Sequence, residues 1–284
     1  MARSGVMLAY PFNLQAIIKR WSWPIIVQPK YNGFRGRSEY GDGYRLLSSE
    51  SNEFNSVPHI NKALNQQLGT ILPDGEIYQH GRSLTGPNGV NSVVKRKLNL
   101  HPDSAQMEYH IFDIINERKQ EDRLAELAEV KLKWPLIKVS VFYAYSLEEL
   151  YEICGKMCCL GYEGIILRQP YTYYTPRKVP FMMKLKPTKD DHYKIINFRE
   201  EISIENVPKN RLGSVQCIDT KGSTFWVGSG FDAFQRENLW KNPKKLIGQF
   251  CHVKYQELTT RGVPVPPVVL DIVDTNPEAA NSLD

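Results

Sequence analysis

The chain has 284 residues, which leaves room for one large domain or two smaller ones. Hydrophobic residues make up 42% and charged residues 24%, so the composition excludes a disordered chain, a collagen-like chain and a disulfide-stapled miniprotein. The net charge of +5 is mild but uneven, because residues 1–187 hold 24 Lys and Arg against 18 Asp and Glu. This excess favours a polyanionic partner, a nucleotide or a nucleic acid.

Neither a membrane anchor nor a cysteine framework is visible. No run of residues is long and apolar enough to span a bilayer, and residues 1–9 lack the apolar stretch of a signal peptide. The five cysteines are odd in number and lack C-x-x-C spacing, which argues against a disulfide framework or a zinc site. We therefore expect a cytoplasmic protein with no membrane partner and with reduced cysteines.

Short β-rich runs alternate with turns through the first 187 residues. A helix is predicted from Ser146, which begins a capping box with Glu149, to Leu160, and a second helix over residues 123–133. A further helix is expected to carry the basic run at 95–97. The predicted strands are 25–28, 34–40, 44–48, 76–78, 109–115, 164–168 and 181–185.

The sequence changes after Lys186-Pro187. Short strands separated by turns are predicted there, with a helix near 232–240, and this spacing is typical of a small β-barrel. The predicted strands are 194–199, 213–218, 224–228 and 249–257. We therefore expect two domains, at residues 1–187 and 188–284.

The sharpest local motif is Lys30-Tyr31-Asn32-Gly33-Phe34-Arg35, in which a strand ends in a Lys with a Gly three residues on and an Arg two further. A lone K-x-x-G is common, and by itself it indicates a surface Lys before a turn. Four further segments follow in order: Asp74-Gly75-Glu76-Ile77, His110-Ile111-Phe112-Asp113, Glu163-Gly164-Ile165-Ile166-Leu167-Arg168 and Lys184-Leu185-Lys186-Pro187.

Together these five segments resemble the nucleotidyltransferase motifs of ATP-dependent DNA ligases, a superfamily shared with RNA ligases and mRNA capping enzymes. The later segments 227–231 and 253–257 resemble the OB domain of small viral and bacterial DNA ligases. The resemblance implies an α+β fold, in which a two-sheet, ATP-grasp-like adenylation domain precedes an all-β OB-fold domain. It also implies an enzyme from the cytoplasm of a bacterial or phage-infected cell.

The same resemblance implies a reaction. A Lys amine attacks the α-phosphorus of ATP and holds AMP, which passes to the 5′-phosphate of a nick before the 3′-hydroxyl displaces it. The implied cofactors are ATP and Mg²⁺ or Mn²⁺, the implied partner is nicked duplex DNA, and we expect a monomer. Lys30 is the implied nucleophile, and its surroundings must favour the neutral amine because a free lysine is protonated at pH 7. Nearby cations would do this.

Roles for the other motif residues follow from the resemblance. Glu163 is expected to bind the metal, and Glu76 to contact the metal or the ribose. Phe112, on a strand face shared with His110 and Ile114, would stack on adenine, and Gln28 would reach the adenine edge. The implied ATP- and AMP-binding residues are Gln28, Arg35, Glu76, Phe112, Lys184 and Lys186, the last two on one strand face.

The basic run Lys95-Arg96-Lys97 is the candidate contact to DNA phosphates, which would bind DNA without sequence preference. A solvated helix face is an equal alternative for this run.

Three positions depart from the family pattern. Asn32 stands where DNA ligases usually carry Asp. Ser49 stands in place of an Arg, for which Arg45 or Arg37 would substitute, and no Arg follows Arg261 near the C-terminus. These departures leave an RNA ligase and a catalytically impaired DNA-end-binding relative open as alternatives, with a capping guanylyltransferase as a third.

Overall fold

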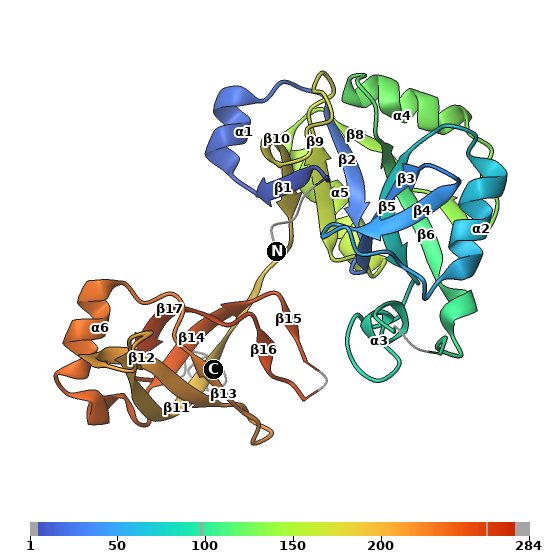
Figure 1. Ribbon diagram of the computed structural model, residues 1–284. Helices are drawn as coiled ribbons and strands as arrows, with labels where there is room; N and C mark the ends of the chain where they lie inside the picture. Colours follow the sequence, from blue (N-terminus) through green and yellow to red (C-terminus); the bar gives the residue numbers. More distant parts are fainter. Residues whose placement is uncertain (1–4, 97–98, 260, 276–284) are drawn as a thin grey trace. The chain divides into compact units, whose positions relative to one another are not determined.

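The structure, a computed structural model, describes residues 5–96, 99–259 and 261–275. The chain divides into two compact units, Met1–Lys186 and Pro187–Asp284 (Figure 1). Among the described residues, no helix is both long and apolar enough to cross a membrane.

The first unit contains two five-stranded sheets (Figure 1). Neighbouring strands of the first sheet are antiparallel except for the parallel pair β1 and β10. Its strands, in spatial order, are β1 (Leu8–Pro11), β10 (Lys178–Leu185), β9 (Gly164–Arg168), β2 (Ile25–Lys30) and β8 (Phe142–Ala144).

The second sheet is antiparallel except for the pair β6 and β7. Its strands, in spatial order, are β4 (Tyr44–Ser48), β3 (Phe34–Tyr40), β5 (Pro73–Tyr78), β6 (Glu108–Ile114) and β7 (Leu136–Lys138).

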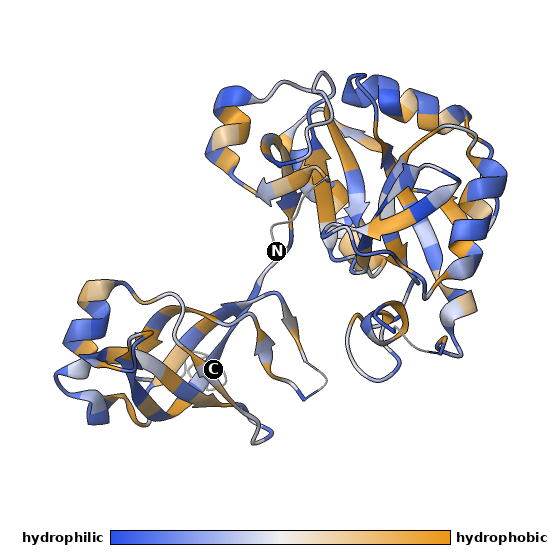
Figure 2. Ribbon diagram, in the orientation of Figure 1, coloured by the Kyte–Doolittle hydropathy of each residue, from blue (hydrophilic) through white to orange (hydrophobic). Residues whose placement is uncertain are grey.

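Helices cover these sheets with their apolar sides. Helices α1 (Leu14–Arg20) and α5 (Leu147–Cys159) share a core with β2 and β9, and α2 (Pro58–Gln67) and α3 (Val90–Val94) share one with the second sheet. Helix α4 (Gln120–Glu129) packs on β6, and a 3₁₀ turn spans Ser104–Gln106. In Figure 2 the strands carry long apolar stretches, whereas α2 and α4 are mostly hydrophilic.

Two helix predictions need correction. Ser146 caps α5 by accepting a hydrogen bond from the Glu149 amide at 3.2 Å, but the Glu149 carboxylate accepts from Tyr145 N instead of Ser146 N, so the capping box is half formed. Helix α3 ends at Val94, and Lys95 and Arg96 follow it. The prediction that a helix carries the basic run is therefore wrong for these two residues, and Lys97 lies outside the described residues.

A β-bulge changes the faces of β6. Asp74 pairs with Asp113 while the next residue, Gly75, pairs with Ile111, so Phe112 is an extra residue on its strand. Ile114 consequently joins the same core as Ile111, and the predicted shared face of Phe112 and Ile114 is wrong. Phe112 instead packs in a separate hydrophobic cluster with Tyr31, Tyr78 and Val139.

The second unit is built on one five-stranded antiparallel sheet. Its strands, in spatial order, are β13 (Thr224–Val227), β12 (Pro208–Ile218), β11 (Lys189–Ile202), β14 (Phe250–Tyr255) and β17 (Val268–Val273). The Val269 amide donates to the Ser229 carbonyl at 2.8 Å, which links β17 back to the chain after β13, as barrel closure requires.

The smaller elements of this unit complete the barrel. Helix α6 (Ala233–Trp240) begins with a full capping box between Asp232 and Gln235. A 3₁₀ turn spans Pro243–Leu246, and strands β15 (Glu257–Leu258) and β16 (Pro264–Val265) form a hairpin.

Candidate active site

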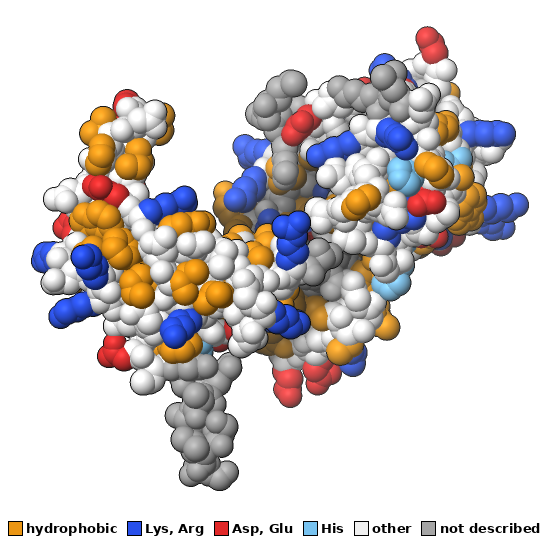
Figure 3. Space-filling model, turned by 90° about the horizontal axis from the view of Figure 1, so that it is seen from below, with side chains coloured by type: hydrophobic (Ala, Val, Ile, Leu, Met, Phe, Trp, Pro, Cys, Tyr) orange, Lys and Arg blue, Asp and Glu red, His pale blue; other side chains and the backbone are white. Residues whose placement is uncertain are grey.

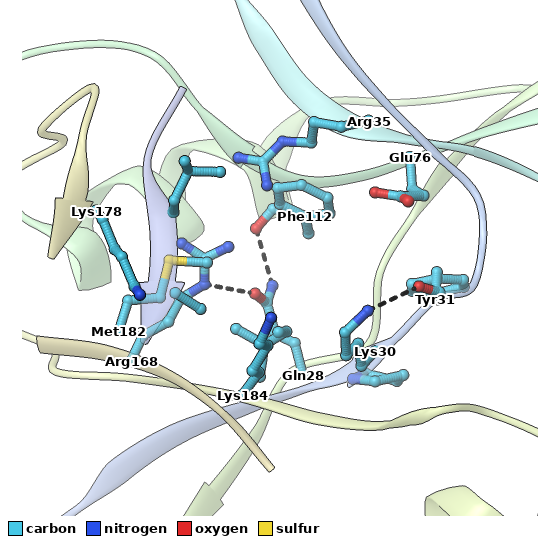
Figure 4. Close-up of a pocket in the computed structure, with 14 residues that line it drawn as sticks. Gln28, Lys30, Tyr31, Arg35, Glu76, Phe112, Arg168, Lys178, Met182 and Lys184 are labelled. Atoms are coloured by element: carbon cyan, nitrogen blue, oxygen red, sulfur yellow. Dashed lines mark hydrogen bonds between the residues drawn. The ribbon is translucent and has the colours of Figure 1, made fainter. Parts of the chain in front are cut away.

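A cavity of about 300 Å³ lies between the two sheets of the first unit, lined by residues of both (Figure 4). Six residues predicted from the sequence line it: Gln28, Lys30, Arg35, Glu76, Phe112 and Lys184. Eight further lining residues were not predicted as site residues: Leu8, Ala9, Pro29, Tyr31, Ile166, Arg168, Lys178 and Met182.

Lys30 is the last residue of β2 and pairs with Gly164 at the start of β9. Its Nζ forms an ion pair with the Glu163 carboxylate and donates to the Tyr31 carbonyl at 3.3 Å. The Lys30 and Glu163 side chains are each 20% exposed. Gly164 has φ +144°, and a Cβ there would lie 2.2 Å from the Leu185 carbonyl oxygen, so only glycine lets β9 approach β10 this closely.

The Lys30 amine has a pKa below its usual range. Burial is the largest cause, the Glu76 carboxylate opposes it, and the Arg35 guanidinium adds to the lowering. The direction agrees with the need for a neutral amine.

Glu163 contacts two lysines, because Lys186 Nζ forms an ion pair with its other oxygen. Lys184, two residues earlier on β10, lines the cavity itself. Glu163 contacts Lys30, which lines the cavity, and Lys186, so these two lysines and the carboxylate come together at one end of the site. We call this end, with Lys30, Glu163 and Lys186, the charged end.

Glu76 lies on β5, where its carboxylate accepts a hydrogen bond from the Gly33 amide. A Cβ at residue 33 would lie 2.3 Å from the Ile77 carbonyl oxygen, which explains the glycine of the K-x-x-G motif. Burial raises the pKa of Glu76 to about 7, although Lys30 and Arg35 oppose this. Glu76 therefore titrates near neutral pH.

Arg35 is held in place by Asp74. Its Nε donates to Asp74 Oδ1 at 2.6 Å, and its Nη2 donates to Asp74 Oδ2 at 2.5 Å and to the Met7 carbonyl at 3.2 Å. The Arg35 guanidinium carbon lies 4.5 Å from the centre of the Phe112 ring. Arg35 therefore helps to fix the aromatic ring as well as adding positive charge.

The opposite end of the cavity is the base end, defined by Gln28, Phe112 and Arg168. The Gln28 Nε2 donates to the Phe112 carbonyl at 2.8 Å, and the Arg168 Nε donates to Gln28 Oε1 at 2.9 Å (Figure 4). Gln28 and Arg168 are 1% and 2% exposed. Both ends of the Gln28 amide thus have a protein partner.

Other predicted residues lie elsewhere. Lys95 and Arg96 are exposed and do not line the cavity, and the Lys95 Nζ lies 5.4 Å from the centre of the Phe34 ring. Arg261 is exposed in the second unit, where its carbonyl accepts from Ser223 Oγ. Figure 3 shows Lys and Arg side chains spread over the face in view, not gathered in one patch.

The carboxylates suit a metal that arrives with a phosphate ligand. Within the described ranges, no group of three or more His, Cys, Asp and Glu side chains could form a metal cage. Mg²⁺ commonly binds only one or two carboxylates, together with phosphate oxygens and waters. Glu76 and Glu163 could supply the carboxylates. The donor set therefore fits a nucleotide-bound Mg²⁺ or Mn²⁺.

Two family models match the chain. The model described as ATP dependent DNA ligase domain matches residues 6–186, and the model described as DNA ligase OB-like domain matches residues 205–272. The chain belongs to the ATP-dependent DNA ligase family. It is an enzyme of that family, and the comparisons do not favour an RNA ligase, an impaired DNA-end-binding relative or a capping enzyme.

Individual DNA ligases resemble the chain over most of its length. A DNA ligase of Haemophilus influenzae is 24% identical over 272 residues, which cover 93% of this chain and 90% of the relative. A solved Lig E DNA ligase structure, described as DNA binding with a minimal scaffold, has a TM-score of 0.75 at 22% identity, covering 94% of this chain and 98% of its own.

A Chlorella virus DNA ligase–adenylate structure has a TM-score of 0.52 at 24% identity, covering 95% of this chain and 98% of its own. These structural likenesses confirm the predicted α+β fold with an OB-like domain. The predicted family and its use of ATP are confirmed by the family match.

Proposed function

We propose that this ligase seals 5′-phosphate/3′-hydroxyl nicks in duplex DNA, with Lys30 as the residue that carries AMP. The observation that carries the proposal is the position of Lys30 at the end of β2. There its amine lines the cavity, is partly buried, and has a lowered pKa beside Arg35. A partly buried amine with a lowered pKa is the form of lysine that acts as a nucleophile.

In the first step the Lys30 amine, after losing a proton to solvent, attacks the α-phosphorus of ATP. The N–P bond forms, the bond from the α-phosphorus to the pyrophosphate oxygen breaks, and the second amine proton leaves to solvent. Lys184, Lys186 and Arg35 are the cations that would bind the phosphates and the departing pyrophosphate.

In the second step a 5′-phosphate oxygen of the nick attacks the same phosphorus, the N–P bond to Lys30 breaks, and the lysine nitrogen takes up a proton from solvent. In the third step the 3′-hydroxyl attacks the 5′-phosphate and loses its proton to solvent, the phosphodiester bond forms, and the bond between the 5′-phosphate and AMP breaks to release AMP. Glu163 and Glu76 would hold a divalent metal, which when bound neutralises phosphate charge.

At the base end, Phe112 would stack on adenine and Gln28 would contact its edge, because both line the cavity next to each other. All the described residues that line the cavity belong to one unit of a single chain, so the proposal takes the monomer as the active form. Lys95 and Arg96 remain candidates for contacts with DNA phosphates, since both side chains are exposed.

The test combines two assays on the wild-type chain. The protein is incubated with Mg²⁺ and α-labelled ATP or GTP, and then offered nicked DNA and nicked RNA side by side. We expect covalent label from ATP and sealing of the DNA nick. Labelling only from GTP, or sealing only of RNA, would contradict the proposal.

A further inference from the structure

Gln28 is fixed in one orientation by its two partners. Its oxygen faces the Arg168 Nε–H at 2.9 Å, and its nitrogen faces the Phe112 carbonyl at 2.8 Å. A reversed amide would point a donor at a donor and an acceptor at an acceptor in a site with almost no exposure. The protein therefore decides which end of this amide lies on which side.

Arg168 is itself held from behind by a buried ion network. Its Nη1 donates to Asp113 Oδ2 at 3.1 Å and to Gln120 Oε1 at 3.0 Å. Asp113 also accepts two hydrogen bonds from Arg123, at 2.8 and 3.0 Å, and both of these side chains are fully buried. The network joins two arginines to one aspartate, so Arg168 cannot turn away from Gln28 without also losing its ion pair with Asp113 and its hydrogen bond to Gln120.

The orientation of an amide determines which purine it matches. Adenine carries a donor at N6, whereas guanine carries an acceptor at O6, so an amide oxygen suits adenine at that position and an amide nitrogen suits guanine. Each end of the Gln28 amide keeps one further hydrogen-bonding capacity beyond its protein partner. An amide that is free to rotate could form this hydrogen bond with either adenine or guanine.

We propose that Arg168 is a positioning residue that holds the Gln28 amide in one orientation, with its oxygen presented to the 6-position of the purine, and so makes the enzyme discriminate ATP from GTP. The proposal rests on the proposed function, because it assumes that the base end receives the purine. Arg168 acts through Gln28, and Arg168 is itself held in place by the Asp113–Arg123 pair behind it.

The experiment measures the ratio of covalent labelling from ATP to labelling from GTP, under single-turnover conditions with Mg²⁺. In Arg168→Met we expect this ratio to fall about tenfold or more, because the released amide can rotate. The substitution leaves the Asp113–Arg123 pair intact, so the buried site keeps balanced charge. Gln28→Met should lower the ratio similarly, and the double variant should lower it no further.

Lys178→Met is the matched control. Lys178 lines the same cavity and carries the same charge, but its described contact is with the Tyr10 ring, 4.3 Å away, and not with Gln28. We expect a higher KM for both nucleotides in this variant and an unchanged ratio of labelling from ATP to labelling from GTP. If Arg168→Met does not fold, Arg168→Lys replaces it, since an ammonium cannot make both the Gln28 and the Asp113 contacts of the guanidinium.

The outcomes separate the two proposals. If the wild type takes no label from ATP, the proposed function fails. If the wild type prefers ATP and Gln28→Met loses that preference while the Arg168 variant keeps it, only the positioning role of Arg168 is overturned. An equal loss of preference in the Lys178 control would overturn it too, because general loosening of the cavity would then explain the effect.

Discussion

The two ends of the cavity are built in opposite ways. At the base end, Gln28 and Arg168 are 1% and 2% exposed, and their hydrogen bonds to each other, to Phe112 and to the buried Asp113 leave them one arrangement. At the charged end, the Lys30 and Glu163 side chains are 20% exposed, and the described ion pairs run from the lysines to one shared carboxylate.

The difference separates recognition from chemistry. The base end is ordered before any ligand arrives, so binding a purine there costs little side-chain entropy. At the charged end, Glu163 forms ion pairs with both Lys30 and Lys186, and a triphosphate must replace these pairs with its own charges. Substitutions at the charged end should therefore change reaction steps, and substitutions at the base end should change nucleotide choice.

The largest effect is expected at Lys30. Lys30→Ala should lower covalent labelling from ATP by on the order of 10⁴-fold or more, because no other amine replaces the nucleophile. Lys30→Arg should fail as well, since a guanidinium stays protonated at neutral pH. Gel detection of label checks this, with circular dichroism to verify folding. Labelling of Lys30→Ala at the wild-type rate would assign the nucleophile elsewhere.

Removing Glu163 should have the next largest effect. Glu163→Ala should leave the fold intact and cut labelling on the order of 10²- to 10³-fold, with a shifted Mg²⁺ dependence, if the carboxylate binds the metal. Glu163→Gln keeps the shape of the side chain and loses only its charge. It should reduce labelling as Glu163→Ala does, which would assign the effect to the charge. A magnesium titration with unchanged midpoint and rate in both variants would refute the assignment.

Glu76 should set the pH dependence of the charged end. Its pKa is raised to about 7, so above this pH it is ionised and raises the pKa of Lys30. Glu76→Gln should therefore lower the pKa of Lys30 and move the acidic limb of the labelling rate to lower pH. Single-turnover labelling from about pH 6 to 10 gives the pH position of this acidic limb, even where the maximal labelling rate falls. A limb that moves to higher pH is the opposite result.

The smallest effect is expected at Asn32, two residues after Lys30 on the loop before β3. Asn32→Asp should speed sealing of a pre-adenylylated nick by up to about tenfold, because a carboxylate can assist the 3′-hydroxyl and an amide cannot. Labelling from ATP should change less. Both rates are measured in single turnover, and slower sealing or equal gains in both would show that the site is built around the amide.

The residues of the charged end could be predicted from the sequence more completely than those of the base end. Lys30, Glu163, Lys184 and Lys186 could be named from the sequence because they stand in motifs that resemble those of ATP-dependent DNA ligases, and the pairing of β2 with β9 is what brings Lys30 beside Glu163. Arg168 stands at the end of one of those motifs, yet nothing local indicates that it meets Gln28 from a strand 140 residues away. Lys178 has no motif at all, and its place in the cavity depends on pairing of β1 with β10.

The errors in the fold have physical causes as well. Helix α1 was missed although Asn13 caps it, because the helix is only seven residues long and contains one fully buried residue, Ile17. The face of Phe112 was mispredicted because a bulge breaks strand alternation, and a bulge depends on the partner strand. The strands 34–40, 44–48 and 164–168 were predicted with their observed bounds, since turn residues flank each of them.

A crystal structure of the protein after reaction with ATP and Mg²⁺ tests the contrast between the two ends most directly. The account predicts AMP bonded to Lys30 Nζ, the Lys30–Glu163 pair broken, and the Gln28–Arg168 and Gln28–Phe112 hydrogen bonds unchanged. AMP on another residue, or a base end that rearranges while the Lys30–Glu163 pair persists, would contradict it.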